Sequence, residues 1–314
     1  MNKYSVDFNT IADDVYSDIS RQITADDVGI NDILDRIFSK KGKVVRPVFM
    51  ALLGKLAGGS WQEIRKAAFV IESVHIASLI HDDVVDGSSL RRGSATLNAA
   101  YSDKTSVLFG DLIFMKALSA AHGFKHPRAF SVLNMAIERM IEGEIREELA
   151  QGTIDEKTYL EIIGGKTASL FAASGELAVL LSGGDERMAS LGGQLGENIG
   201  MAFQIIDDTL DFVGKTEVMG KPRLADVMSE RFTLPVISAI RTLSQEEIAS
   251  CLSGGVDSAE AIAEIVRDNG GIDYSYEKAR EYSMKAQAIL ERFGVADASM
   301  IFEDFLDMVL SRAY

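Results

Sequence analysis

Two aspartate-rich segments are the residues of this sequence best suited to chemistry. One runs from Asp82 to Asp86 and the other from Asp207 to Asp211, and both have the spacing Asp-Asp-x-x-Asp behind an apolar run. On a helix, aspartates four residues apart lie one turn apart on one face, where two like charges destabilise the helix. A hard cation between them turns this repulsion into ligation, and oxygen ligands suit magnesium. A single segment is most simply a solvated acidic helix end, but the repetition favours two carboxylate clusters that hold magnesium around a diphosphate.

Basic residues gather at separate places along a chain whose formal charge is −15. Lys43 and Arg46 precede Pro47, which suits the first turn of a helix, and cations beside free helix N–H groups form an anion site. Arg91 and Arg92 follow the first aspartate segment, where paired guanidinium groups suit bidentate diphosphate binding. Taken alone, the turn that contains Lys43 and Arg46 could equally be a solvated basic turn.

Two further stretches carry lysines and glycines. Lys166 follows two glycines within an apolar stretch, and a buried lysine needs an anion nearby to stay charged. Residues 214–223 contain glycines and three cations, including Lys221, and are predicted to form a loop that covers an anionic ligand. An ordinary solvated loop is the alternative.

The elements that must position these residues are predicted to be helices. Apolar residues recur at helical spacing almost throughout, and the alternation typical of strands is nearly absent. The predicted helices are two before residue 38, then 61–85, 102–122, 127–151, 157–182 and 186–213, with further helices to the C-terminus. Methionines such as Met135 and Met140 are expected to pack the core.

Composition limits the class of protein. The 314 residues are 47% hydrophobic, contain only 4 prolines and show no linker, so we expect one all-α domain spanning residues 1–314. The acidic charge argues against a nucleic-acid binder. The sequence shows no signal peptide and no apolar run long enough to span a bilayer, and its lone Cys251 fits a reducing compartment. We therefore expect a cytoplasmic protein.

The order of these motifs resembles the trans-type polyprenyl diphosphate synthase family, which includes farnesyl, geranylgeranyl and octaprenyl diphosphate synthases. The resemblance runs from about Gly42 to Pro235. It is carried by Gly-Lys-x-x-Arg-Pro at 42–47, both aspartate motifs, Arg-Arg-Gly at 91–93, Lys-Thr at 166–167, Gln204, Gly-Lys-Pro at 220–222, and Thr-Leu-Pro at 233–235. Two positions depart from the family pattern: Arg231 stands where a lysine is usual, and Lys41 where a glycine is common.

The resemblance implies a fold, a reaction and a set of roles. The fold would be antiparallel helices around a central cavity, usually in a homodimer. The reaction would join isopentenyl diphosphate to an allylic diphosphate and give an apolar product that associates loosely with membranes. About three magnesium ions, held by Asp82, Asp86 and Asp207, would neutralise the leaving diphosphate. The implied catalytic residues are Asp82, Asp83, Asp86, Lys166, Asp207, Asp208 and Asp211. The implied substrate-binding residues are Lys43, Arg46, His75, Arg91, Arg92, Lys166, Thr167, Gln204, Lys221 and Arg231.

Product length is predicted from the residues that precede the first aspartate segment. Ala77 lies about 7.5 Å before Asp82 along the helix, and in family members with short products an aromatic residue near this level often closes the cavity. Ala77, Ser78 and Val74 are not bulky. We therefore expect a product of roughly C30 to C45, with the final limit set by a facing helix near Met135.

Four alternatives remain open from the sequence. They are a shorter-chain farnesyl or geranylgeranyl diphosphate synthase, a class I terpene cyclase, a His-Asp metal phosphohydrolase suggested by His81, and a regulatory subunit of a heteromeric synthase. The second aspartate segment and Lys43 and Arg46 argue against the cyclase. The count of 4 histidines argues against the phosphohydrolase, and the presence of both aspartate motifs argues against the regulatory subunit.

Overall fold

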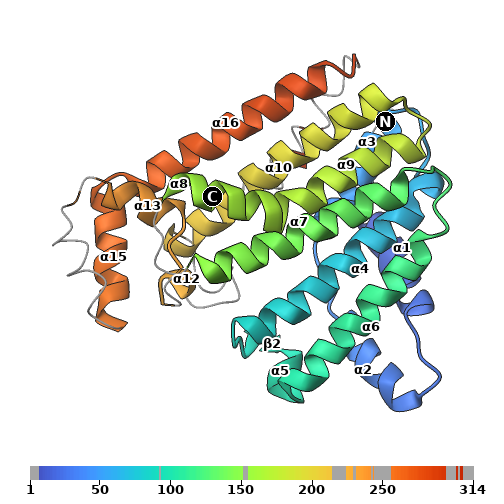
Figure 1. Ribbon diagram of the computed structural model, residues 1–314, viewed down its shortest axis with the longest axis horizontal. Helices are drawn as coiled ribbons and strands as arrows, with labels where there is room; N and C mark the ends of the chain where they lie inside the picture. The colour runs from blue at the N-terminus through green and yellow to red at the C-terminus, as the bar shows by residue number, and fades with distance from the viewer. Residues whose placement is uncertain are drawn as a thin grey trace. The chain divides into compact units, whose positions relative to one another are not determined.

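Helices make up nearly all the regular structure of the computed structural model (Figure 1). It describes residues 7–91, 93–150, 155–213, 224–228, 231–241, 243, 256–294, 302, 305 and 306. The helices before residue 130 are α1 (Phe8–Gln22), α2 (Val28–Phe38), α3 (Val45–Leu56), α4 (Trp61–Val85), α5 (Leu97–Ala100), α6 (Asp103–Ala121) and α7 (Ala129–Leu149). The later ones are α8 (Glu156–Ile163), α9 (Ser169–Leu181), α10 (Glu186–Val213), α12 (Ala225–Met228), α13 (Leu234–Ile240), α15 (Val256–Asp268) and α16 (Gly271–Glu291). The predicted all-α class is confirmed.

The chain divides into two compact units. Unit 1 contains Met1–Asn134, Ala173–Gln194 and Glu291–Phe302, and unit 2 contains Met135–Ala172, Leu195–Leu290 and Glu303–Tyr314. The first aspartate segment belongs to unit 1 and the second to unit 2. The expectation of one domain over residues 1–314 stays a prediction.

Side-chain caps explain where several helices begin. Asp7, Asp27, Ser102 and Asp155 each precede a helix, and their side chains accept hydrogen bonds from backbone N–H groups of its first turn. Such caps satisfy donors that the helix cannot pair internally. The predicted helix boundaries at Trp61 and Val85, and at Glu186 and Val213, are reproduced.

In unit 1, α4 is the helix that carries the first aspartate segment. It packs against α1, α3 and α6, and Figure 1 shows α4 and α6 side by side. Its middle part is fully buried, including Ala67, Phe69, Val70 and Val74. A two-stranded antiparallel hairpin, β1 (Leu90–Arg91) with β2 (Ser94–Ala95), follows the helix. In the described part of the chain, no helix is both long and apolar enough to cross a membrane.

The stretch predicted as one helix over residues 157–182 is interrupted, so that prediction was wrong in detail. A π-helical turn, η1 (Gly164–Ala168), separates α8 from α9. Gly165 lies against α7: a Cβ built on it would come 2.7 Å from the carbonyl oxygen of Arg139 and 3.0 Å from Cα of Gly143. Single π turns inside helices often occur at functional sites, and this one contains Lys166.

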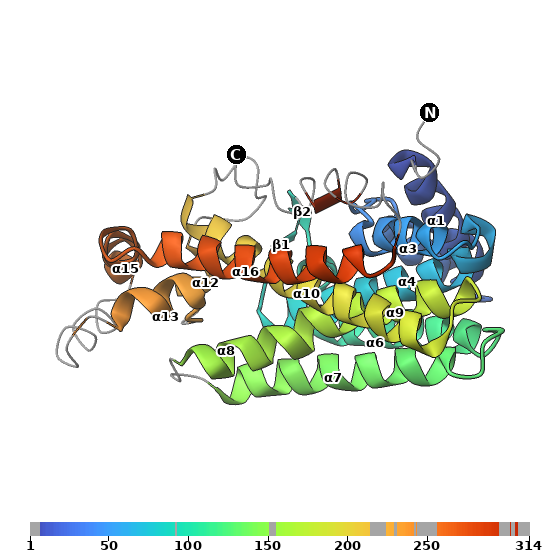
Figure 2. The same ribbon diagram turned by 90° about the horizontal axis from the view of Figure 1, so that it is seen from above.

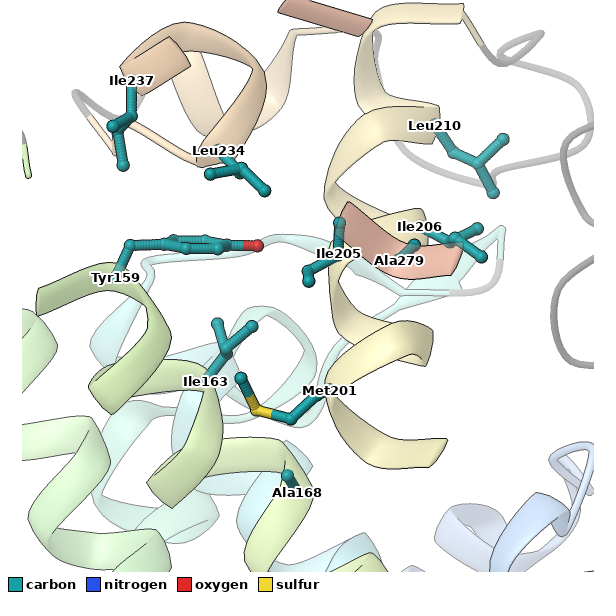
Figure 3. Close-up of a cluster of buried hydrophobic side chains, with 10 residues drawn as sticks. All are labelled: Tyr159, Ile163, Ala168, Met201, Ile205, Ile206, Leu210, Leu234, Ile237 and Ala279. Carbon is teal, nitrogen blue, oxygen red and sulfur yellow. The ribbon is translucent and has the colours of Figure 1, made fainter. Parts of the chain in front are cut away.

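Two hydrophobic clusters lie among the described residues of unit 2, and α13 contributes to both. Leu234 and Ile237 join Tyr159, Ile205 and other residues from α8, α10 and α16 in the cluster drawn in Figure 3. The second cluster contains buried residues of α10, α12, α13 and α15, and α13 and α15 lie close together in both Figures 1 and 2. The ends of α8 and α10 are thereby packed on a common core.

Glu156, the first residue of α8, links α8 to α13 and α16. It accepts a 2.7 Å hydrogen bond from the hydroxyl of Tyr274 and another from Arg241, and Lys278 lies 3.3 Å away. Partial burial alone would raise the pKa of Glu156, but the hydrogen bonds from Tyr274 and Arg241 and the charge of Lys278 together lower it. A lowered pKa means that the ionised carboxylate stabilises the folded state.

Glu156→Gln should lower the free energy of unfolding by about 0.5–1 kcal/mol at pH 7. The contribution of Glu156 is complete above its ordinary pKa of 4.5 and is lost as the pH falls through the lower folded-state value. Urea unfolding should therefore show a larger difference from the unsubstituted chain at pH 7 than at pH 3. Glu264→Gln, on the exposed surface of α15, is the control. An equal loss at both pH values would contradict the electrostatic explanation.

Candidate active site

Asp82 and Asp86 occupy successive turns at the end of α4. The amide of Asp86, which caps the helix, donates a 2.8 Å hydrogen bond to the carbonyl oxygen of Asp82. Both residues are partly exposed, whereas Asp83 between them is buried. The predicted arrangement of two carboxylates one turn apart is therefore present in unit 1.

Asp83 is held by the hairpin that follows α4. The Nε atom of Arg91 donates a 2.7 Å hydrogen bond to Oδ1 of Asp83, and the amide of Ser88 donates to its backbone carbonyl. Burial raises the pKa of Asp83, and the charge of Arg91 opposes this in part. Arg91, predicted to bind diphosphate, therefore already has a carboxylate partner. Arg92 lies outside the described residues.

The basic turn before α3 combines an exposed and a buried cation. Lys43 is exposed, whereas Arg46, in the first turn of α3 as predicted, is only 8% exposed. Burial lowers the pKa of Arg46 to about 10, and the nearby charge of Glu72, itself buried on α4, opposes the shift. Between the two cations, Val44 has a φ of 43°. A β-branched residue in this left-handed conformation is strained, and such strain collects at functional sites.

In unit 2, two hydrogen bonds of 2.7 Å join the second aspartate segment to the Lys-Thr pair through Gln204, and a third of 2.7 Å joins it to Tyr159. The hydroxyl of Thr167 donates to Oε1 of Gln204, and Nε2 of Gln204 donates to Oδ1 of Asp208. The hydroxyl of Tyr159 donates to Oδ2 of Asp208, and Figure 3 shows its ring reaching from α8 toward α10. Both oxygens of Asp208 are thus satisfied by protein groups, while Asp207 beside it is partly exposed.

In both aspartate segments, the second aspartate is buried and hydrogen-bonded to protein groups. Asp83 and Asp208 are both buried and bonded to protein donors, whereas Asp82, Asp86 and Asp207 retain exposed surface. The last position differs, because Asp86 is partly exposed and Asp211 is fully buried. Sequence spacing alone does not separate these roles, and it gave no reason to single out Tyr159.

Lys166 is partly buried and has anion partners close to its ammonium group. Its Nζ atom lies 2.8 Å from Oε2 of Glu144 and 2.5 Å from Oε2 of Glu147, two residues of α7. The side chain of Lys166 is 22% exposed. The sequence placed both glutamates on the helix before it but did not indicate which would reach the lysine.

The residues predicted to control product length lie on the side of α4 that meets α6. His81 packs against Gly110 of α6, and a Cβ at Gly110 would come 2.2 Å from its Nε2. Ala77 and Val74 precede His81 by one and two turns, share its face, and have no exposed surface. Ser78 is partly exposed.

Met135 does not fill the role expected from the sequence. It is 61% exposed in the folded chain, so the interpretation that it packs the core was wrong, although Met140 is buried. The side chain lies on an exposed face of α7. Helical spacing alone did not distinguish this face from the buried one.

The remaining predicted residues are placed incompletely. His75 and Arg231 are partly exposed, and Arg231 precedes the N-cap of α13 by two residues. Lys221 and the predicted covering loop at 214–223 lie outside the described residues, as does Cys251.

The donor set fits magnesium. In the described ranges, no group of three or more His, Cys, Asp or Glu side chains forms a ready metal site. Magnesium is commonly bound by one or two carboxylates together with water and substrate phosphates. Asp82 and Asp86 in unit 1, and Asp207 in unit 2, supply carboxylates of this kind.

The fold and the two aspartate segments define an all-α protein of the isoprenoid synthase class. A family model described as polyprenyl synthetase matches residues 28–268. The chain belongs to this family and is a prenyltransferase, so the resemblance noted in the sequence is confirmed.

Known relatives match nearly the whole chain. It is 30% identical over 314 residues to heptaprenyl diphosphate synthase component 2 of Geobacillus stearothermophilus, and the match covers 98% of each chain. It is 36% identical over 258 residues to an all-trans-nonaprenyl-diphosphate synthase (geranyl-diphosphate specific) of Rhodobacter capsulatus, covering 80% of this chain and 79% of that one. A solved polyprenyl synthase of Caulobacter crescentus, complexed with calcium and isoprenyl diphosphate, superimposes with a TM-score of 0.91 at 30% identity and covers 100% of both chains.

Proposed function

We propose that the chain extends an allylic diphosphate by successive trans additions of isopentenyl diphosphate to a product of roughly C30 to C45. The observation that carries the proposal is the shared pattern of the two aspartate segments. Protein donors hold Asp83 and Asp208 in buried positions, while Asp82, Asp86 and Asp207 are only partly buried. A chain that only bound an anion would have no use for two such carboxylate sets.

Asp82, Asp86 and Asp207 would hold about three magnesium ions, which supply positive charge to the leaving diphosphate. Lys166, Lys221 and Arg91 would add to that charge at the allylic diphosphate. Arg46 is buried, and its neighbour Val44 is strained, so the turn before α3 has a fixed shape. Such a turn suits a preorganised anion site for isopentenyl diphosphate.

The remaining predicted residues take supporting roles in the proposal. Asp83, Asp208 and Asp211 would shape the two metal-binding segments, and Thr167 and Gln204 would orient the second segment through their hydrogen bonds. His75 and Arg92 would contact isopentenyl diphosphate, and Arg231 the allylic diphosphate. The proton lost when the new double bond forms would pass to the released diphosphate.

The product range rests on the small residues of α4 and on the relatives. Ala77 and Val74 present little volume on the face of α4 that meets α6, and Ser78 lies beside them. Two relatives are named heptaprenyl and nonaprenyl diphosphate synthases, and the chain lengths in both names fall within the proposed range. Incubation with magnesium, isopentenyl diphosphate and farnesyl diphosphate, followed by chromatography of the dephosphorylated products, tests the proposal. A sole C20 product would reject the proposed length and favour a shorter-chain synthase, and recovery of the C15 primer alone would show that farnesyl diphosphate is not extended.

Ala77→Phe should shorten the product, because an aromatic ring on this face of α4 occupies volume that the growing chain needs. Gln62→Phe is the control, because Gln62 lies at an exposed position of the same helix and a ring there extends into solvent. The product distribution should shift toward shorter chains in Ala77→Phe and stay unchanged in Gln62→Phe. The same distribution in both would show that Ala77 does not limit the product.

A second candidate function follows from one relative. Its name, component 2, describes part of a heteromeric synthase. If this chain also needs a partner, the purified protein alone will be inactive and will gain prenyl transfer when the partner is added. Activity of the purified chain by itself favours the first candidate.

We propose that the active form is a cytoplasmic homodimer. Exposed apolar side chains support this: α6 exposes Val107, Leu108 and Met115 in unit 1, and α7 exposes Ile141 and Ile145 in unit 2. Apolar side chains gathered on exposed helices are commonly covered by a partner. Sedimentation of the purified chain, with a monomer as the contrary result, tests the dimer.

A further inference from the structure

The ion-paired cluster of Lys166, Glu144 and Glu147 in unit 2 carries more negative than positive charge. Two carboxylates contact one ammonium group, at 2.8 and 2.5 Å. Their side chains are 25% and 28% exposed, and that of Lys166 is 22% exposed, so water screens the three charges only in part. A diphosphate that approaches Lys166 therefore meets a cluster with a net charge of −1.

Close packing of α7 against η1 brings these groups together. A Cβ on Gly143 would lie 2.4 Å from the backbone nitrogen of Lys166, so only a glycine permits this approach. Glu144 follows Gly143 directly, and Glu147 lies three residues further on the same side of α7. The distance between the helices thus places both carboxylates within reach of Nζ.

We propose that Glu144 and Glu147 compete with the allylic diphosphate for Lys166 and thereby set the enzyme's affinity for that substrate. The inference rests on the proposed function, in which Lys166 contacts the allylic diphosphate. A phosphate oxygen can approach Nζ once one carboxylate has moved away. When the diphosphate leaves, both carboxylates pair with Lys166 again. This competition shortens the time for which the anion stays bound.

Glu147 makes the shorter contact and is therefore the residue to change first. Glu147→Gln keeps the size of the side chain and a hydrogen-bonding oxygen but removes one competing charge. The dissociation constant for farnesyl thiodiphosphate, an allylic analogue that resists ionisation, should fall about two- to fivefold in the presence of magnesium. The KM for the allylic substrate should fall with it, while the KM for isopentenyl diphosphate stays unchanged.

Two comparisons make the experiment specific. Glu138→Gln removes a charge from an exposed position on α7 and should leave the affinity for the analogue unchanged, which controls for the general field of the protein. In a chain that carries Lys166→Met, Glu147→Gln should increase the affinity less than it does when Lys166 is present, because only direct repulsion and not competition for the lysine is then relieved. Thermal unfolding of each variant separates competition from a structural role, because a structural ion pair would change stability without increasing affinity.

An unchanged or raised dissociation constant in Glu147→Gln, or an equal change in Glu138→Gln, would overturn the proposed competition. Failure of the proposed function has a different signature. In that case the unsubstituted chain would form no prenyl product, alone or with a partner, whatever its affinity for the analogue.

Discussion

Asp82→Asn should reduce the turnover of allylic and isopentenyl diphosphate by about a hundred- to a thousandfold. Removing one preorganised charge from a site that stabilises a leaving group typically has an effect of this size. Asparagine keeps the shape of the side chain, so a loss of turnover reports the missing charge. Radiolabelled isopentenyl diphosphate and extraction of the product measure the rate.

Stability should move in the opposite direction. Asp82 and Asp86 lie one turn apart and repel each other in the absence of a cation, so Asp82→Asn should stabilise the metal-free chain by about 0.2–0.5 kcal/mol. Magnesium should stabilise the unsubstituted chain more than the variant. Asp32→Asn, at an exposed position of α2, is the control for both measurements. Turnover within threefold of the unsubstituted chain would show that Asp82 is not a metal ligand that the reaction needs.

Gly165→Ala should destabilise the chain by about 1–3 kcal/mol and reduce prenyl transfer. The added methyl group would come 2.7 Å from the carbonyl oxygen of Arg139, a backbone atom that can move only if α7 moves. Such a shift would separate Lys166 from the two glutamates that contact it. Urea unfolding gives the stability, and the same extraction assay gives the activity.

The neighbouring glycine provides a matched control for this prediction. A Cβ on Gly164 would meet only Sδ of Met201, at 3.8 Å, which is an ordinary contact. Gly164→Ala makes the same chemical change one residue earlier and should leave both stability and activity nearly unchanged. Equal losses in the two variants would show that the contact with α7 does not explain the effect, and helix propensity could not explain it either, because alanine favours a helix more than glycine does.

The sequence by itself determined the helical class, the main helix boundaries and the two aspartate segments. Helical periodicity is local, so the ends of α4 and α10 follow from apolar spacing and from the glycines at 87 and 214 that come shortly after them. Asp82 and Asp86 are four residues apart in sequence, and helix geometry alone places them one turn apart. The need of Lys166 for an anion followed from its apolar surroundings.

Only the tertiary structure decided which partners these residues have. Tyr159 meets Asp208 across 49 positions, and Lys166 meets Glu147 across 19, contacts that depend on how helices pack. Met135 is exposed in the folded chain, and a π turn begins at Gly164 where η1 packs closely against α7. Two aspartates that are adjacent in sequence, Asp207 and Asp208, thus differ in exposure and in hydrogen bonding, because neighbouring residues on a helix face different surroundings.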